Sequence, residues 1–228
     1  MQIWDTRVSH CTWTGLQCDF YFCALPQSIA AAQLKGVSHI MSTKYHRNIR
    51  SLCEGALFIA FAQILSYIRL LPNLPNGGSI TLAMFPIILF SVRWGVGKGL
   101  CAGFVYGLLQ MIFDGAYAWG WQSMLLDYLV AFTPLGLAGL FKGKSWGIFP
   151  GVLIACTARF IVHFISGITI YKILVPTEVP GIGTFDDPTI YSLVYNGSYL
   201  LPSMLLVLAA ATVLYVPLKK YYAGRDIL

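Results

Sequence analysis

Six apolar stretches follow one another from about residue 51 to residue 217, and short polar connections separate them. A helix that spans the hydrocarbon core of a bilayer needs about 20 predominantly apolar residues. The pattern therefore predicts an all-α integral membrane protein with six transmembrane helices. The second stretch is short enough to be tilted or to span less than the full core, and the last two are long enough to tilt or protrude. The stretches cover residues 51–71, 79–93, 96–113, 121–141, 147–175 and 189–217.

The first 40 residues do not follow this pattern. They mix Trp4, Trp13 and three cysteines with scattered polar residues, and show neither helical nor strand periodicity. No basic segment precedes an apolar core, so the pattern is not that of a signal peptide. Two interpretations are open: a poorly ordered extension, or upstream sequence included by a start codon assigned too early. In both, residues 41–228 form the six-helix transmembrane domain that binds a substrate.

The composition supports the membrane class. Of the 228 residues, 57% are hydrophobic and 11% are charged, whereas a soluble domain carries about 25% charged residues. Basic residues gather in cytoplasmic loops of membrane proteins, and only Arg69 and Lys172 fall between the predicted helices on one side of the membrane. Both termini are therefore expected in the cytoplasm, on the side that receives ten basic residues: Lys44, Arg47, Arg50, Arg93, Lys98, Lys142, Lys144, Lys219, Lys220 and Arg225.

Small residues recur at helical spacing in three of the predicted helices. Gly55, Ala56 and Ala60 lie in the first. Such residues let helices approach closely in lipid, and two uses are open: packing within the bundle, or docking of a separate membrane protein. The third and fourth helices carry a similar series, formed by Gly95, Gly99, Gly103, Gly107, Gly136 and Gly139.

Polar and ionisable residues interrupt the last three apolar stretches. Arg159 and His163 lie one helical turn apart in the fifth, Asp127 lies in the fourth, and Tyr191 and Asn196 lie in the sixth. Such groups are costly at membrane depth and normally face a partner or a polar cavity. With a rise of about 1.5 Å per helical residue, the predicted topology places most of them in the outer half of the membrane. The sequence predicts a pocket that opens outward and is lined by three helices.

The residue types in this group suit recognition of a flat, cationic ligand. Asp127 supplies a negative charge, and His163 and Asn196 supply hydrogen bonds. A carboxylate beside aromatic rings attracts a cation through ion pairing and cation–π interaction. The alternative is a structural ion pair between Asp127 and Arg159, which leaves no free charge for a ligand, although Arg159 is expected to lie deeper. The aromatic faces come from Tyr128, Tyr171, Tyr191 and Tyr195.

The sequence carries no signature of catalysis or nucleotide binding. It has no Ser/His/Asp-like set, no HExxH motif and no glycine-rich phosphate-binding motif with lysine. No cofactor and no nucleic-acid partner are expected. Without an ATPase motif the protein either moves its solute passively or relies on a partner for energy. No metal site is expected either, because the spacing matches no familiar zinc motif at the one candidate cluster, His10, Cys11, Cys18 and Cys23.

Two connections on the predicted outer side are rich in turn-forming residues. Residues 71–79 contain two prolines and two glycines, and residues 176–188 contain three prolines and two glycines. Neither can continue a helix. Each is either a lid over the pocket or a plain surface turn.

Several motifs, in order and at consistent spacing, resemble the thiamine-specific S component of bacterial energy-coupling-factor transporters. Together they lie within residues 51–215. They are Ile-Leu-Ser-Tyr-Ile at 64–68, Leu-Asp-Tyr-Leu-Val-Ala-Phe at 126–132, Gly-Leu-Ala-Gly-Leu-Phe at 136–141, Ala-Arg-Phe-Ile-Val-His-Phe-Ile-Ser-Gly at 158–167 and Tyr-Ser-Leu-Val-Tyr-Asn-Gly at 191–197.

The resemblance implies a six-helix substrate-binding subunit in the plasma membrane of a bacterium. Such a subunit captures thiamine from outside and associates with a transmembrane coupling protein and two cytoplasmic ATPase subunits. By position, the resemblance also implies that Ala56 and Ala60 dock the coupling protein and that residues 69–79 form a lid. The ligand contacts that it implies are Asp127, Tyr128, His163, Tyr171, Tyr191 and Asn196.

The chain departs from the family pattern at three places. Asp127 stands where the family usually has glutamate, Tyr171 stands where it tends to have a stacking tryptophan, and the lid lacks the tryptophan of some members. A subunit for another small heterocycle, such as a hydroxymethylpyrimidine precursor of thiamine, is therefore an alternative within transport. Two alternatives come from other classes. An intramembrane enzyme using His163 and Asp127 would modify its ligand, and a structural scaffold would not need converging polar groups.

Overall fold

A computed structural model describes residues 27–70, 74, 77–114, 121–171, 177–179 and 181–224. Side chains are described from Tyr45 onward, with the exception of those of Ile170, Tyr171 and Thr177. The chain forms two compact units, Met1–His46 and Arg47–Leu228. The second unit contains all six predicted apolar stretches.

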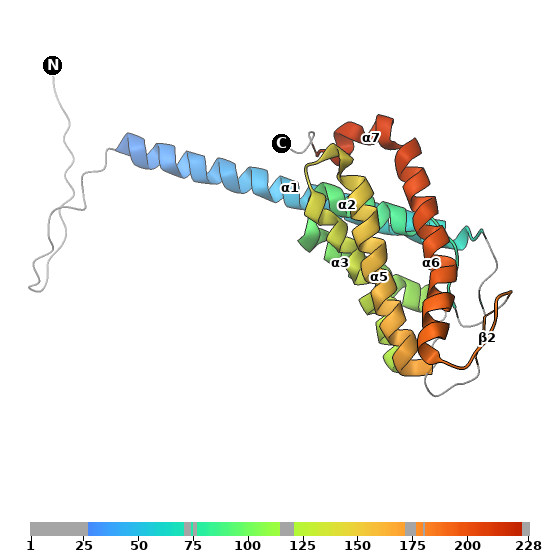
Figure 1. The fold of residues 1–228 in the computed structure, drawn as a ribbon. Coiled ribbons are helices and arrows are strands. Elements are labelled where there is room, and N and C mark those ends of the chain that lie inside the picture. Colours follow the sequence, from blue (N-terminus) through green and yellow to red (C-terminus); the bar gives the residue numbers. More distant parts are fainter. Residues whose placement is uncertain are drawn as a thin grey trace, which may run out of the picture. The chain divides into compact units, whose positions relative to one another are not determined.

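The described part of the chain is mostly helical (Figure 1). Within the described residues, five helical segments are long and apolar enough to cross a membrane: Tyr45–Tyr67, Val96–Phe113, Trp121–Phe141, Ser145–Thr169 and Pro188–Val213. They correspond to the first, third, fourth, fifth and sixth predicted stretches. The elements are α1 (Gln27–Tyr67), α2 (Met84–Trp94), α3 (Val96–Phe113), α4 (Trp121–Met124), η1 (Leu125–Val130), η2 (Thr133–Phe141), η3 (Ser145–Gly147), α5 (Ile148–Tyr171), β1 (Thr177–Val179), β2 (Gly183–Phe185), α6 (Pro188–Val213) and α7 (Tyr215–Tyr222).

Two element boundaries differ from the sequence prediction. Helix α1 begins at Gln27, inside the segment that shows no periodicity. The connection from α5 to α6 contains a short antiparallel hairpin in which Glu178 pairs with Thr184. Prolines and glycines exclude a helix there, but they do not exclude two three-residue strands joined by a tight turn.

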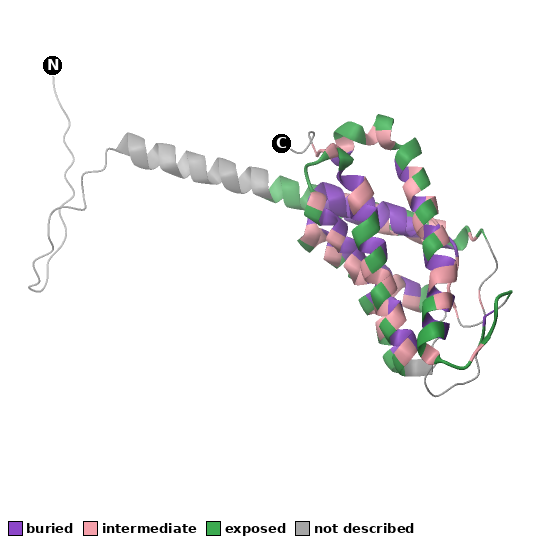
Figure 2. Cartoon of the chain, viewed as in Figure 1, coloured by how far each residue is buried: buried purple, intermediate pink, exposed green. Residues whose placement is uncertain are grey.

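Helix α2 is short and is buried along its whole length. All eleven of its residues are buried, and Figure 2 shows it as a nearly continuous buried segment. A helix that is apolar on all sides belongs in an interior. Ile87, Ile88 and Val92 form the centre of the main hydrophobic core together with Leu135 and Val152. The second predicted stretch is thus the central helix of the bundle.

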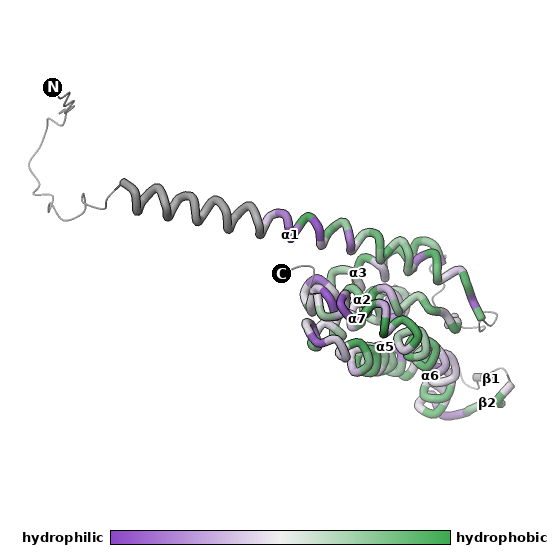
Figure 3. The backbone as a smooth tube through the Cα atoms, turned by 90° about the horizontal axis from the view of Figure 1, so that it is seen from above, coloured by the Kyte–Doolittle hydropathy of each residue, from purple (hydrophilic) through white to green (hydrophobic). Residues whose placement is uncertain are grey.

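The outward faces of the longer helices are apolar. Leu57 and Ile64 of α1 and Leu205 of α6 are more than half exposed, and Figure 3 shows apolar residues along most of these helices. Large exposed apolar patches are rare on soluble monomers. Because lipid tails are as apolar as these side chains, the pattern is that of a bundle surrounded by a bilayer.

The fourth apolar stretch is not one regular α-helix. Its middle part, Leu125–Val130, is π-helical, and Thr133–Phe141 is a 3-10 helix. Pro134 has no backbone N–H and its ring clashes with the carbonyl four residues earlier, so it interrupts the α-helical ladder. The π-helical turn contains Asp127 and Tyr128. π-Helical turns within α-helices often occur at functional sites.

The glycines of α3 serve packing within the bundle. A methyl group on Gly103 would lie 2.5 Å from the carbonyl oxygen of Phe132, and one on Gly107 would lie 2.6 Å from that of Tyr128. Gly136 lies directly against the backbone of Gly99 and Leu100. For this series the interpretation as intramolecular packing is confirmed. Of the three small residues singled out in α1, Gly55 is buried against Phe90, whereas Ala56 and Ala60 are exposed.

A buried ion-pair network joins α1, α2 and α7. Arg93 donates from Nε to Oε2 of Glu54 over 2.8 Å and from Nη2 to Oε1 over 3.2 Å. Trp94 Nε1 and the Tyr221 hydroxyl also donate to Oε2, at 2.8 Å and 3.2 Å. The Arg93 guanidinium carbon lies 3.8 Å from the centroid of the Tyr221 ring. Helix α7, which carries Tyr221, lies at the end of the bundle away from β2 (Figure 1).

Candidate ligand pocket

A cavity of about 330 Å³ lies between the ends of the helices on the hairpin side of the bundle. Its wall is made by the end of α1, the connection to α2, and parts of α3, η1, α5 and α6. The lining is mixed, because hydroxyl, amide and charged groups alternate with aromatic rings. A cavity of this kind, with a few polar groups in an apolar frame, is typical of small-molecule sites.

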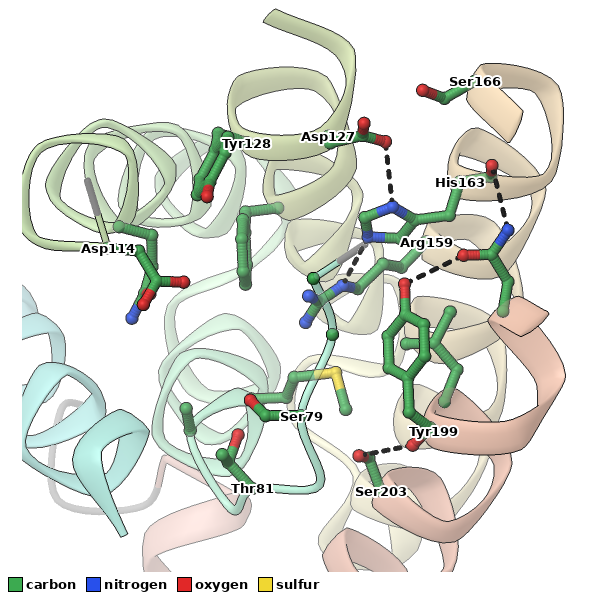
Figure 4. Close-up of a pocket in the computed structure, with 18 of the residues that line it drawn as sticks. Ser79, Thr81, Asp114, Asp127, Tyr128, Arg159, His163, Ser166, Tyr199 and Ser203 are labelled. Atoms are coloured by element: carbon green, nitrogen blue, oxygen red, sulfur yellow. Dashed lines mark hydrogen bonds and ion pairs between the residues drawn. The ribbon is translucent and has the colours of Figure 1, made fainter. Parts of the chain in front are cut away.

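Asp127 reaches the cavity from the π-helical turn. Its Oδ2 accepts a hydrogen bond from the Ser123 hydroxyl over 2.7 Å, and its Oδ1 lies 3.1 Å from Nδ1 of His163 (Figure 4). The Asp127 side chain is 28% exposed. Among the described residues it makes no ion pair with a lysine or arginine. Its charge is therefore accessible from the cavity.

Arg159 is separated from Asp127 by His163. The Arg159 Nε donates to Nε2 of His163 over 3.3 Å, and its guanidinium carbon lies 3.9 Å from the centroid of the Phe132 ring. The side chains of Arg159 and His163 both line the cavity. Asp127 and Arg159 therefore do not form the direct ion pair that the sequence analysis offered as an alternative. The imidazole of His163 lies between them and is hydrogen-bonded to both (Figure 4).

Helix α6 contributes three tyrosines at four-residue spacing. The Tyr191 and Tyr195 rings are stacked with centroids 5.4 Å apart, and the Tyr195 and Tyr199 rings meet edge to face at 6.1 Å. Residues four apart share one face of a helix, so the three rings form a continuous aromatic wall. All three are buried and line the cavity.

Asn196 joins α6 to α5. Its Nδ2 donates to the carbonyl oxygens of His163 and Ser192, at 3.2 Å and 2.9 Å, and its Oδ1 accepts from the Tyr199 hydroxyl at 2.9 Å. The Ser192 hydroxyl donates in turn to the carbonyl oxygen of Phe164 over 2.9 Å. Asn196 therefore holds the His163 turn of α5 in register with the aromatic wall.

The connection between α1 and α2 covers part of the cavity. The Tyr195 hydroxyl donates to the carbonyl oxygen of Gly77 over 2.6 Å. Gly78 has a φ of +96°, and a methyl group there would lie 2.8 Å from the Tyr199 ring. Only glycine fits this backbone conformation and this close approach without strain. Gly77, Gly78 and Ser79 all line the cavity.

An ion pair ties the ends of α1 and α3 beside this connection. Arg69 Nη2 lies 2.7 Å from Oδ1 of Asp114. Both side chains are partly exposed and line the cavity. In the connection between α5 and α6, Val179 of β1 is buried in a cluster with Ile80 and Tyr191. Both connections thus contact the aromatic wall or its neighbours.

The structure brings most of the predicted site residues to one cavity. Asp127, Tyr128, His163, Tyr191 and Asn196 all line it. The side chain of Tyr171 lies outside the described residues. Ala56 and Ala60 lie elsewhere, exposed on α1, as a docking surface requires. Within the described ranges, no three His, Cys, Asp or Glu side chains are close enough to hold a metal ion, and the cluster of His10, Cys11, Cys18 and Cys23 lies outside those ranges.

Sequence reasoning missed several polar residues of the wall. Gln110 donates to the Tyr106 hydroxyl over 2.6 Å, and both are buried in α3 beside the cavity. A glutamine inside an apolar stretch is the signal that would have found this pair. Tyr199 had a signal too, because it continues the spacing of Tyr191 and Tyr195. No sequence signal indicated the pair of Asp114 and Arg69, since their contact depends on where the ends of α1 and α3 meet.

Comparison with known proteins places the chain among transport proteins. Residues 52–223 match the model of the thiamine transporter protein family (Thia_YuaJ). A protein named thiamine transporter ThiT from Bacillus subtilis strain 168 is 34% identical over 169 residues, which cover 68% of this chain and 84% of the relative. A second thiamine transporter ThiT, from Lacticaseibacillus paracasei, is 30% identical over 202 residues, which cover 79% and 94%.

A solved structure has the same fold. ThiT from Listeria monocytogenes superimposes with a TM-score of 0.66, covering 77% of this chain and 98% of the other. The two sequences are 23% identical.

Proposed function

This chain belongs to the thiamine transporter protein family, and we propose that it is the thiamine-binding subunit of an energy-coupling-factor type uptake transporter. One observation carries the proposal: Asp127 presents a carboxylate to a cavity with an aromatic wall, and no lysine or arginine among the described residues pairs with it. Thiamine consists of a cationic thiazolium ring and an aminopyrimidine ring. Its charge and its flat rings match these two features of the cavity.

The residues of the pocket have distinct roles in this proposal. Asp127 balances the thiazolium charge, and Tyr128 and Tyr191 supply flat surfaces for the rings. His163 orients Asp127, and Asn196 fixes the α5 turn that carries His163. Tyr171 contributes a further aromatic face. The protein binds and releases its ligand unchanged, as a transporter does, and is not an enzyme.

The proposed topology has six transmembrane helices with both termini in the cytoplasm. In the part of the chain that the structure describes, five helices have the length and composition to span a bilayer, and α2 is the proposed sixth, enclosed by the others. The distribution of basic residues supports cytoplasmic termini. The pocket then opens to the outside of a bacterial plasma membrane, where a vitamin is captured.

Energy for uptake comes from partners in this proposal, because the chain has no nucleotide-binding motif. The partners are a transmembrane coupling protein and two cytoplasmic ATPase subunits. Ala56 and Ala60 are exposed beside the exposed Leu57, so a partner helix can approach closely along this face of α1. The ligand pocket lies on a different part of the fold and stays free for the substrate.

The proposed functional domain is residues 41–228. The match to the family begins at residue 52, and the residues that line the pocket begin at Ser66. Both positions lie within residues 41–228, which supports this assignment of the functional domain.

Calorimetric titration of the purified full chain in detergent tests the proposal. Thiamine, thiamine monophosphate and 4-amino-5-hydroxymethyl-2-methylpyrimidine serve as ligands. Thiamine should bind most tightly, and the recovered ligand should be chemically unchanged. Tighter binding of the pyrimidine would favour the precursor as substrate, and modification of the ligand would favour an enzyme.

A further inference from the structure

Arg159, His163 and Asp127 form a hydrogen-bonded chain along the wall of the pocket. Arg159 Nε lies 3.3 Å from His163 Nε2, and His163 Nδ1 lies 3.1 Å from Asp127 Oδ1 (Figure 4). The Nε of an arginine always carries a hydrogen and can only donate. His163 Nε2 must therefore offer its lone pair, and the only hydrogen of the imidazole must be on Nδ1, where it is donated to Asp127.

This assignment follows from the hydrogen-bond network and fixes the charge of each member. His163 is neutral, because a protonated imidazole would place an N–H against the N–H of Arg159. Asp127 accepts from two neutral donors, His163 and Ser123, and keeps its full negative charge. Both nitrogens of His163 form hydrogen bonds within the protein, so His163 orients Asp127 while its ring lines the cavity.

The surroundings of His163 contain no other charged group among the described residues. Asp127 faces it from η1, and Arg159 lies on its own helix. Helix α6 places the Tyr199 ring 6.2 Å away, edge to face, together with the uncharged Asn196. The imidazole itself is buried. Burial and the positive charge of Arg159 both favour the neutral form of His163, whereas the carboxylate of Asp127 favours the charged form.

We propose that Arg159 is a positioning residue that keeps His163 neutral and so reserves the negative charge of Asp127 for the cationic part of the ligand. The inference rests on the proposed function, in which the charge of Asp127 binds the ligand. It identifies Arg159 as the residue that keeps this charge available. Without Arg159, His163 gains a proton in mildly acidic solution, because the carboxylate beside it favours the charged form. The resulting imidazolium pairs with Asp127, and the carboxylate is no longer available to the ligand.

The test is the pH dependence of thiamine binding in three purified variants. In Arg159→Met the donor and the positive charge are lost, so Asp127 favours a protonated His163 against burial alone. Affinity should then fall by more than about threefold between pH 8 and pH 5.5, because a smaller fraction of the protein presents a free Asp127 to the ligand. The unchanged protein and Arg159→Lys, which retains a cationic donor, should vary less than about twofold over this range.

The double variant Arg159→Met/His163→Asn is the matched control. Asparagine cannot take up a proton, so the affinity of the double variant should be lower but independent of pH. Any titration of thiamine itself should change the affinity equally in the unchanged protein and in all three variants. A flat profile for Arg159→Met alone would overturn the proposal. A steep profile that persists in the double variant would overturn it as well, because His163 would then not be the group that titrates.

A ligand-independent measurement separates this inference from the proposed function. Long-range ¹⁵N spectra of the histidines should report a neutral Nδ1–H tautomer for His163 at pH 5.5 in the unchanged protein and an imidazolium in Arg159→Met. The His163→Asn variant identifies its signal among the four histidines of the chain. If no protein binds thiamine at any pH, the proposed function fails while these spectra still decide the role of Arg159. A protonated His163 in the unchanged protein would refute that role.

Discussion

Glu54 of α1 and Arg93 of α2 form a two-point ion pair in which both guanidinium–carboxylate contacts are 3.2 Å or shorter. The Arg93 side chain is completely buried, and that of Glu54 is 18% exposed. A buried guanidinium is stable only while its carboxylate is present, because the charge has lost its water. The contact therefore holds the helix that carries Ala56 and Ala60 against the central helix of the bundle.

Removing this carboxylate should destabilise the fold. Glu54→Ala leaves Arg93 buried without its main partner, and the free energy of unfolding should fall by about 3 kcal/mol. Thermal unfolding in detergent measures the loss. Arg50→Ala is the matched control, because its contact with Glu54 is half exposed and should contribute less than about 1 kcal/mol. Equal effects of both substitutions would show that the network as a whole, rather than the buried pair, stabilises this end.

Asp127→Asn should weaken thiamine binding by about 1.5–3 kcal/mol, the contribution of a hydrogen bond or contact that involves a charged group. Binding of the neutral hydroxymethylpyrimidine should suffer less, because it carries no thiazolium charge. Asp114→Asn is the control, since this second carboxylate of the cavity is already paired with Arg69. If Asp127→Asn weakens both ligands equally, the carboxylate is structural.

The connection between α1 and α2 should control the rate of ligand release. Tyr195→Phe removes the hydrogen bond to Gly77, which is worth about 0.5–1.5 kcal/mol, and should speed dissociation by about two- to tenfold. Stopped-flow fluorescence with excess competitor measures that rate.

Two neighbouring glycines allow a matched comparison of the same connection. Gly77 and Gly78 both have positive φ, but only a methyl group on Gly78 meets the Tyr199 ring. Gly78→Ala should therefore accelerate release more than Gly77→Ala, which adds backbone strain alone. If the two variants release thiamine at the same rate, the contact with Tyr199 does not hold the connection closed.

The sequence predicts the membrane class and the positions of the helices well, because the length of an apolar stretch is a local property. It also identifies several of the residues that meet in the pocket, such as Asp127, His163 and Asn196, since a polar group in an apolar stretch needs a polar environment. It does not predict which of them touch. Arg159 and His163 are one turn apart and their contact is foreseeable, whereas the place of His163 between Arg159 and Asp127 depends on the π-helical turn of η1.

Other features depend on long-range geometry. Glu54 and Arg93 are 39 residues apart, and nothing in either local sequence indicates the partner. Pro134 does indicate a break in the fourth stretch, but the π-helical and 3-10 turns that surround it depend on how closely α3 approaches through its glycines. The burial of α2 on all sides likewise follows from the arrangement of the other helices.

A protein that starts at Met41 should insert into membranes and bind thiamine like the full chain. Among the residues whose side chains are described, those that line the cavity begin at Ser66, and the family match begins at residue 52. The truncated protein retains both. Expression level and calorimetric affinity are the measurements. A truncated protein that inserts but does not bind would show that residues 1–40 are part of the functional unit.

Replacing Ala56 and Ala60 together by tryptophan should separate ligand capture from transport. Both residues are exposed on α1 and absent from the wall of the pocket, so the double variant should bind thiamine in detergent with near-normal affinity. Close helix contact in lipid requires small side chains, so docking of the coupling protein should be blocked. Uptake of labelled thiamine, in cells supplied with the coupling protein and both ATPases, should then be lost.

A tryptophan at another exposed position of α1 controls for bulk alone. Ile64 is also more than half exposed on this helix but is already large, so Ile64→Trp should leave uptake near normal. Continued uptake by the double variant would remove Ala56 and Ala60 as the docking face. Loss of thiamine binding in the double variant would instead place the two alanines in the internal packing of the bundle, because tryptophan would then disturb the fold that supports the pocket.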